Sequence, residues 1–171
     1  MKGCCVDYFL TTKIDWNDTN HFPYDTFYWQ GIDGTKVFTH FNTTHHHPDV
    51  QDVSANIVGG IKQKTVTDKR MLTFGFGDGG GGPQFEMCEM ARRIEDLDGV
   101  PKTRYSRVGD FMQELERDCV RPNTYRGELY LELHRGTLTN QHTIKRNNRK
   151  SEYALRDLEI MTVNEAVKAG K

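Results

Sequence analysis

A glycine tract that contains one acidic residue is the segment of this sequence best suited to chemistry. The run Gly75-Phe76-Gly77-Asp78-Gly79-Gly80-Gly81-Gly82-Pro83 follows a short apolar stretch that predicts a strand. Residues without side chains leave room for a bulky polar ligand to approach Asp78 closely. A carboxyl group at the end of a barrel strand can serve as a general acid or base, because burial raises its pKa toward neutral pH. On spacing alone, a surface loop with an incidental aspartate explains the tract equally well.

The same tract also matches a dinucleotide-binding fingerprint. The spacing Gly75-x-Gly77-x-x-Gly80 lies between a predicted strand and a predicted helix, and the acidic cluster Glu95-Asp96-Asp98 follows about twenty residues later. Two features weigh against this alternative. Asp78 would place a negative charge in the loop that must cradle a pyrophosphate, and no second strand follows promptly to carry an acidic ribose ligand.

Two other sets of potential metal ligands are weaker. The run His45-His46-His47 lies in a predicted loop, and successive side chains of an extended segment point to opposite faces. At most two of these histidines can therefore reach one ion, and we do not expect a metal there. The four cysteines show no Cys-x-x-Cys spacing, which argues against a zinc ribbon or a thioredoxin-type pair and favours reduced thiols.

The segments that must position these residues alternate between strands and helices. Apolar and β-branched residues predict strands at 6–12, 26–29, 36–41 and 71–76, and helical spacing predicts helices at 48–63, 83–97 and 108–118. Asp33-Gly34 suits a tight hairpin between the second and third strands. The alternation favours an α/β fold in which helical crossovers connect the strands of a parallel sheet.

The chain changes character after Pro122. The run 128–134 predicts extended or irregular structure, and the polar stretch 140–167 predicts one long helix with a thin apolar stripe. Such a helix needs neighbours that this chain does not supply. We therefore predict a domain boundary near Tyr125, with domains at 1–125 and 126–171.

The composition excludes several classes of protein. A length of 171 residues corresponds to about one domain, and 11% aromatic residues argue against disorder. The 23 Lys and Arg against 24 Asp and Glu leave a net charge of -1, which argues against a nucleic-acid surface. No apolar run is long enough for a bilayer, and Asp7 interrupts any secretory signal. We expect a cytoplasmic protein without nucleic-acid or membrane partners.

Three ordered motifs resemble glycoside hydrolase family 38, the α-mannosidases, and its cytosolic, vacuolar and bacterial branch in particular. They are the glycine tract 75–83, Gly127-Glu-Leu-Tyr-Leu-Glu-Leu-His-Arg-Gly-Thr137 and Asn148-Arg-Lys-Ser-Glu152. The N-terminal segments 6–14, 16–20 and 22–27 fit the same family in the same order, so the resemblance covers most of the chain.

The resemblance implies a fold and a fragment. It implies the C-terminal part of a seven-stranded α/β barrel in 1–125 and the start of a three-helix bundle in 126–171. The family's nucleophilic aspartate, in a Trp-x-x-Asp-x-Phe-Gly motif, and its first His and Asp metal ligands would precede Met1. We therefore expect a fragment that is inactive alone.

The resemblance also assigns roles to individual residues. It implies that Asp78 is the general acid/base of a retaining glycosidase, whose two carboxyl groups lie about 5 Å apart. It further implies that His134 is a ligand of a divalent metal, most often zinc, which cannot be held by one ligand alone. Lys13 lies where other branches place an arginine beside the nucleophile, although a solvated surface lysine fits as well. Trp16 and Trp29 are candidate sugar contacts.

The expected function is hydrolysis of α-mannosidic linkages in mannose-containing oligosaccharides by the parent enzyme. The sequence leaves open whether that full-length enzyme is a homo-oligomer. Two alternatives also stay open: a dinucleotide-binding module built on Gly75–Gly80, and a non-catalytic remnant that packs with a partner chain.

Overall fold

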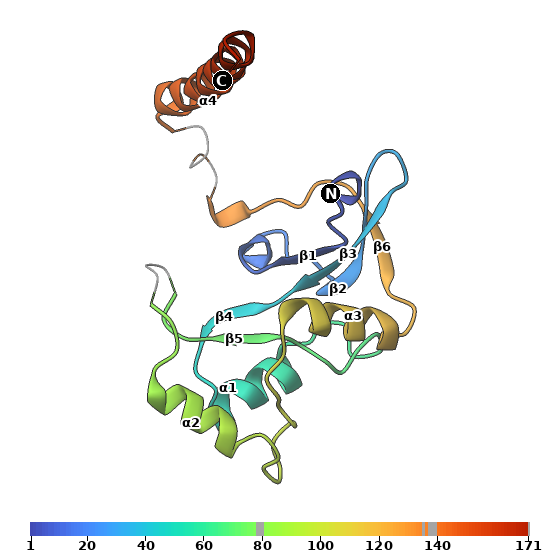
Figure 1. The fold of residues 1–171 in the computed structure, drawn as a ribbon. Helices are drawn as coiled ribbons and strands as arrows, with labels where there is room; N and C mark the ends of the chain where they lie inside the picture. The colour runs from blue at the N-terminus through green and yellow to red at the C-terminus, as the bar shows by residue number, and fades with distance from the viewer. Residues whose placement is uncertain (78–80, 135, 137–139, 171) are drawn as a thin grey trace. The chain divides into compact units, whose positions relative to one another are not determined.

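The chain forms two compact units, Met1–Leu133 and His134–Lys171, in a computed structural model that describes residues 1–77, 81–134, 136 and 140–170 (Figure 1). The predicted boundary near Tyr125 falls inside the last strand of the first unit, and the domain assignment stays a prediction. Each unit is described by itself below.

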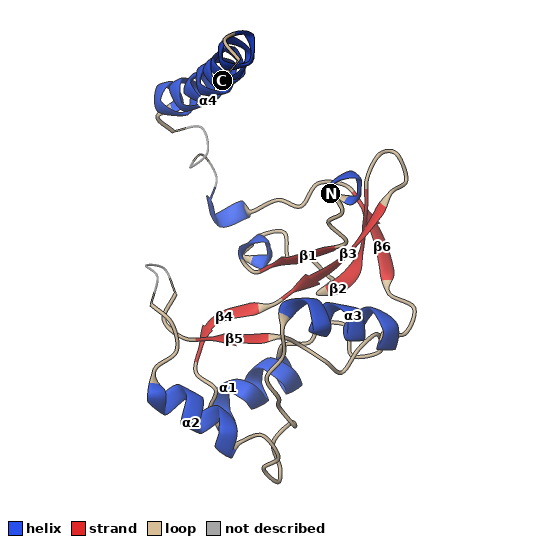
Figure 2. Ribbon diagram, in the orientation of Figure 1, coloured by secondary structure: helices blue, strands red, loops and turns tan. Residues whose placement is uncertain are grey.

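Among the described residues, the first unit contains every strand and the helices α1 to α3 (Figure 2). The strands are β1 Tyr8–Thr11, β2 Thr26–Gln30, β3 Lys36–Phe41, β4 Thr43–His46, β5 Leu72–Phe74 and β6 Asn123–Arg126. The α-helices are α1 Val50–Ser54, α2 Phe85–Arg93 and α3 Val108–Asp118, and α1 continues into a π-helical turn, Ala55–Gly59. Three 3₁₀ turns lie at Lys2–Cys4, Lys13–Asp15 and Glu132–His134.

The strands form a mostly parallel arrangement. One sheet has the order β1-β3-β2-β6, in which β1 runs parallel to β3, β6 runs parallel to β2, and only β2 and β3 are antiparallel. A second sheet pairs β4 with β5 in parallel. Together with the helices, this is the mixed α/β fold that the sequence predicts.

The antiparallel pair is the predicted hairpin. The Gly31 N–H donates to the Thr35 carbonyl at 2.9 Å, and Asp33 Oδ1 accepts from the Thr35 N–H at 3.0 Å. Gly34 adopts φ +85°, which side-chain-bearing residues rarely do. The Asp-Gly pair therefore closes this turn for the reason expected from the sequence.

The central strand of the four-stranded sheet, β3, is buried on both faces. On one face, Phe38 of β3 packs with Met112 and Leu115 of α3, and these three residues are at most 1% exposed. On the other face, the rings of Phe27 and Phe41 lie 5.4 Å apart. Val37 to Phe41 are consequently all buried, as is typical of a central strand covered on both sides.

Several elements differ in extent from the predictions. α3 covers the predicted residues, and the helix predicted at 48–63 ends at Gly59. The Arg70 guanidinium donates to the Asn56 carbonyl near that end, at 3.2 Å. The prediction of a loop at His45–His47 is wrong for its first two residues, whose backbone belongs to β4. Pairing with β5, a contact distant in sequence, extends the strand there.

The second unit is dominated by one helix. α4 spans His142–Lys168, as the long polar stretch predicts, and none of its residues is buried. Its apolar side chains are largely exposed: Ile144, Leu155, Leu158, Met161, Val163 and Val167. No helix among the described residues is both long and apolar enough to cross a bilayer.

Candidate active site

The glycine tract is closed at its two ends by backbone contacts. The Phe76 N–H donates to the Gly82 carbonyl at 3.0 Å, and the two residues form an isolated antiparallel bridge. Gly75 has φ +115°, and a Cβ there would lie 2.7 Å from the Pro83 nitrogen. A Cβ at Gly81 would lie 2.5 Å from the Phe76 carbonyl oxygen. Glycine is therefore required at both positions. The predicted acid/base, Asp78, lies outside the described residues.

The tract and the loop after β1 both follow the carboxyl ends of parallel strands. Asn42, which separates β3 from β4, is 7% exposed and connects these ends. Its N–H donates to the Thr11 carbonyl at 3.0 Å, and its Oδ1 accepts from the Thr12 hydroxyl at 3.1 Å. Its Nδ2 donates to the Thr73 hydroxyl of β5 at 3.3 Å. One buried amide thus ties the strand before Lys13 to the strand before the glycine tract.

Lys13 and Trp16, two of the predicted site residues, lie together. The Lys13 ammonium is 5.3 Å from the centre of the Trp16 ring, a cation–π geometry. Both side chains are accessible, with Trp16 37% exposed. They lie on and directly after the 3₁₀ turn Lys13–Asp15, in which the Trp16 N–H donates to the Lys13 carbonyl at 2.9 Å. The pair offers a positive charge beside an aromatic face.

Trp29 lies in β2 and has different partners. Its ring contacts that of Phe9 with centroids 5.5 Å apart, and its indole N–H donates to the Gly127 carbonyl at 2.8 Å. These contacts fix the ring on the face of the sheet opposite α3. Its assignment as a sugar contact stays a prediction.

Glu132 is a buried acidic residue whose position the sequence does not reveal. It is 4% exposed, and its Oε2 accepts from the backbone N–H groups of Thr19 and Asn20, both at 3.1 Å. Its own N–H donates to Asn17 Oδ1 at 2.7 Å. The only local signal is its place between leucines in Leu131-Glu132-Leu133. The polar run after Trp16 supplies the matching groups, more than a hundred residues earlier.

His134 begins the second unit. It ends the 3₁₀ turn Glu132–His134, directly after Leu133, whose N–H donates to the Trp16 carbonyl at 3.3 Å. The chain that leads to His134 is therefore held against the segment that carries Trp16. An imidazole is a donor that zinc accepts readily. Among the residues that the structure describes, no group of three or more His, Cys, Asp or Glu side chains is arranged to hold a metal.

His40 is a second histidine of interest, but it belongs to the core. It is 1% exposed, and burial, with a smaller contribution from nearby Arg70, lowers its pKa to about 3. Its Nε2 accepts from the Met71 N–H at 3.4 Å, so Nδ1 carries the proton and donates to the Thr26 hydroxyl at 3.0 Å. A neutral imidazole with both nitrogens occupied serves packing and not acid–base chemistry.

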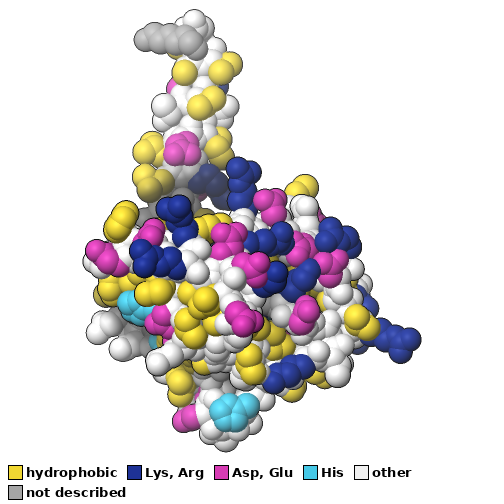
Figure 3. All heavy atoms as spheres, turned by 90° about the horizontal axis from the view of Figure 1, so that it is seen from below, with side chains coloured by type: hydrophobic (Ala, Val, Ile, Leu, Met, Phe, Trp, Pro, Cys, Tyr) yellow, Lys and Arg dark blue, Asp and Glu magenta, His cyan; other side chains and the backbone are white. Residues whose placement is uncertain are grey.

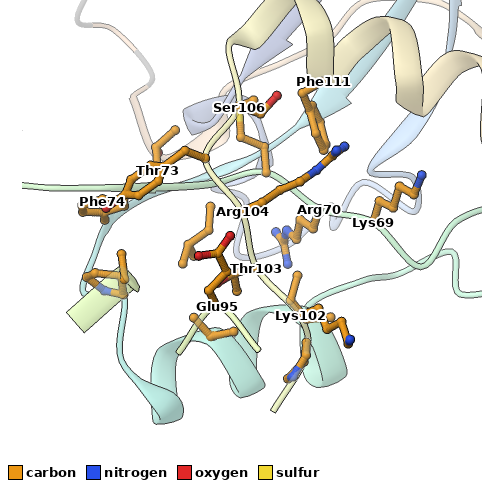
Figure 4. A pocket seen from close by; sticks show the side chains of 18 of the residues that line it. Lys69, Arg70, Thr73, Phe74, Glu95, Lys102, Thr103, Arg104, Ser106 and Phe111 are labelled. Atoms are coloured by element: carbon orange, nitrogen blue, oxygen red, sulfur yellow. The ribbon is translucent and has the colours of Figure 1, made fainter. Parts of the chain in front are cut away.

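One pocket among the described residues is separate from these side chains. A cavity of about 640 Å³ is lined by residues of α1, α2, α3 and β5 and by the segment 101–106 (Figure 4). None of the described site residues, Lys13, Trp16, Trp29 and His134, lines it. The charged side chains at its edge pair with one another, because Glu114 forms ion pairs with both Lys69 and Arg104.

The surface charge is mixed. Viewed from below, positive and negative side chains are interspersed, in agreement with the small net charge (Figure 3).

Comparison with known proteins identifies the family. Residues 1–129 match the model of the glycosyl hydrolases family 38 N-terminal domain. The chain is 39% identical over 165 residues to alpha-mannosidase 2C1 of Mus musculus. This alignment covers 95% of the chain and 16% of the mouse protein. It is 40% identical over 159 residues to alpha-mannosidase G of Dictyostelium discoideum, covering 92% of this chain and 15% of that protein. For the alpha-mannosidase of Saccharomyces cerevisiae the identity is 35% over 180 residues, and the alignment covers 95% of this chain and 16% of the yeast protein.

These matches confirm the resemblance drawn from the three sequence motifs and do not favour the dinucleotide-binding alternative. The chain spans about a sixth of the length of the curated relatives that it matches. It belongs to glycosyl hydrolase family 38.

Proposed function

We propose that this chain is part of a retaining α-mannosidase that hydrolyses α-mannosidic linkages in mannose-containing oligosaccharides. The family match over residues 1–129, together with relatives named α-mannosidases that align with nearly the whole chain, carries this proposal. We further propose that the isolated chain is inactive, because its 171 residues do not contain the Trp-x-x-Asp-x-Phe-Gly motif in which the family carries its nucleophile.

The proposed architecture places residues 1–125 in the C-terminal part of a seven-stranded α/β barrel. In support, β1 runs parallel to β3, β4 runs parallel to β5, and α3 covers one face of the sheet. The proposal also places 126–171 at the start of a three-helix bundle. The 27-residue helix α4, with its exposed apolar residues, is suited to such packing.

Asp78 is the proposed general acid/base. In the first step its proton passes to the glycosidic oxygen as the bond from that oxygen to the anomeric carbon breaks, and the nucleophilic carboxylate bonds to that carbon. In the second step Asp78 takes a proton from water, whose oxygen displaces the nucleophile and restores the configuration. The proposal takes the neighbouring glycines, which carry no side chains, as what would let a sugar approach this residue closely.

A divalent metal, zinc by expectation, is part of the proposal, with His134 as one ligand. When bound, such an ion stabilises negative charge on the oxygens that it contacts. One ligand cannot hold the ion alone, so the proposal requires further ligands beside His134. Lys13 would keep the nucleophilic carboxylate ionised, and Trp16 would present its ring to a sugar. Trp29 would contact sugar from the sheet.

The proposed location is the cytoplasm. All four cysteines are free thiols, as a reducing compartment maintains them. The mass of the complete enzyme in solution will show whether it is a homo-oligomer.

The test begins with the genomic DNA upstream of the first codon. An in-frame Trp-x-x-Asp-x-Phe-Gly segment would define a longer enzyme, whose hydrolysis of an aryl α-mannoside can be measured. Asp78→Asn should lower turnover by about 10²–10⁴-fold and leave metal content unchanged. Asp98→Asn, an exposed aspartate beyond α2, serves as the control. Full turnover in Asp78→Asn would remove the proposed role, and absence of any upstream segment would favour a non-catalytic remnant.

A further inference from the structure

We propose that Glu132 is a positioning residue, which holds the chain leading to His134 so that the imidazole can bind the metal. This inference rests on the proposed function, in which His134 is a metal ligand. It concerns the Glu132 clamp, defined as Glu132, the backbone N–H groups of Thr19 and Asn20, and the side chain of Asn17.

The clamp joins two segments that are distant in sequence. One carboxylate oxygen of Glu132, Oε2, accepts hydrogen bonds from two backbone N–H groups of the loop after Trp16, each with an N···O distance of 3.1 Å. Asn17, itself 9% exposed, accepts the Glu132 N–H at 2.7 Å and donates to the Ile14 carbonyl at 3.0 Å. Both the backbone and the side chain of Glu132 are therefore fixed.

The chemistry of the clamp makes it strong. Hydrogen bonds from N–H groups to an ionised carboxylate are about twice as strong as those between neutral groups. Because Glu132 is 4% exposed, water cannot readily replace it as the acceptor. Loss of the carboxylate would leave two loop N–H groups without their acceptor, which releases the loop.

The position of the clamp links it to metal binding. Only Leu133 separates Glu132 from His134, and all three residues belong to one 3₁₀ turn. The Leu133 N–H also donates to the Trp16 carbonyl. Metal ligands must lie within about 0.2 Å of their ideal distance, so a shift of this turn would displace the imidazole.

The first experiment measures the zinc dissociation constant of the longer enzyme by competition with a chelator. Glu132→Ala should raise this constant about 10–100-fold, as do other substitutions that disturb the support of a ligand. Glu132→Gln should restore part of the affinity, because its amide oxygen can accept both N–H groups but without the carboxylate's charge. Glu132→Asp should not restore it, since its side chain is one methylene too short.

A matched control separates positioning from general loss of stability. Asp25 is 2% exposed, and its carboxylate accepts the Lys62 N–H at 2.7 Å. Asp25→Ala should lower the melting temperature without changing the zinc affinity. In the 171-residue chain, Glu132→Ala should also speed amide hydrogen exchange at Thr19 and Asn20 at least tenfold over the native chain.

The outcomes distinguish this inference from the proposed function. If His134→Ala lowers zinc affinity while folded Glu132→Ala does not, the clamp has no positioning role and the proposed function stands. If His134→Ala leaves zinc affinity unchanged, the metal assignment itself fails. Where Glu132→Ala does not fold, Asn17→Ala decides: native zinc affinity in that variant overturns the inference, and weakened affinity supports it.

Discussion

Phe38 and Glu132 are both almost fully buried, but they are buried in opposite surroundings. Phe38 lies between β1, β2 and α3, where its neighbours are apolar or aromatic and pack by shape. Glu132 lies among backbone N–H groups and one asparagine, where each contact has a direction. The core can tolerate changes of side chain that keep its volume, whereas the Glu132 clamp depends on particular oxygen atoms. The first region gives the unit its stability, and the second fixes the loops that carry candidate site residues.

The largest effect is expected in the core. Leu115→Ala removes a side chain that is 0% exposed and should lower the free energy of unfolding by about 2–5 kcal/mol. Urea denaturation of the chain measures this change. Leu155→Ala in α4, where the side chain is 60% exposed, is the control and should change the value by less than about 0.5 kcal/mol. Equal effects of the two substitutions would show that α3 does not cover a real core.

His40 should make the core sensitive to acid. Its pKa is lowered from 6.5 to about 3 by burial, so between these pH values the unfolded chain binds a proton that the folded chain excludes. The contribution of His40 to stability is therefore complete above pH 6.5 and falls as the pH decreases toward 3. The slope is at most about 1.4 kcal/mol per pH unit.

Denaturation at several pH values tests this expectation. His40→Gln should flatten the slope in that window, whereas substitution of the exposed His21 by Gln should not. An unchanged slope in His40→Gln would mean that carboxyl groups alone set the acid sensitivity.

Asn42 connects the sheet to the loops, and its effect should be intermediate. Asn42→Ala removes the acceptor of the Thr12 hydroxyl and the donor to Thr73, which should cost about 1–2 kcal/mol. Asn20→Ala, which keeps its backbone N–H for Glu132, is the control and should be nearly neutral. In the longer enzyme, Asn42→Ala should also lower turnover. This loss should be larger than the lower melting temperature of the variant explains. Unchanged turnover would limit Asn42 to a structural role.

The smallest effect is expected on the surface. Lys102 and Asp96 form an ion pair at 2.9 Å, with side chains 79% and 72% exposed. Lys102→Ala should change the free energy of unfolding by less than about 0.5 kcal/mol, and raised salt should abolish even that difference. A larger loss would show that the edge of the pocket contributes to the core.

Much of the fold follows from local sequence patterns. The helical spacing in 108–118 predicts α3, and Asp33-Gly34 predicts the hairpin, because the interactions involved lie within a few residues. Local patterns do not predict β4 and β6. The backbone of β4 pairs with β5, and β6 pairs in parallel with β2, so each is a strand because of a distant partner.

The candidate site divides in the same way. The glycine tract and the Leu-His motif that ends at His134 stand out in the sequence because their residue types are unusual. Lys13 and Trp16 are near neighbours in one turn, so their contact follows from local geometry. Glu132 and Asn42 escape notice, because nothing in their immediate neighbours shows that they are buried or which groups they meet.

By itself, the sequence determined the family, the α/β class, the hairpin and the long polar helix, whereas the structure showed why positions 75 and 81 require glycine. Only the tertiary structure decided that Asn42 joins the ends of β1 and β5 and that Glu132 holds the loop after Trp16. The physical reason is that hydrogen-bond geometry between segments up to 115 residues apart depends on how the intervening chain folds. No local periodicity carries that information.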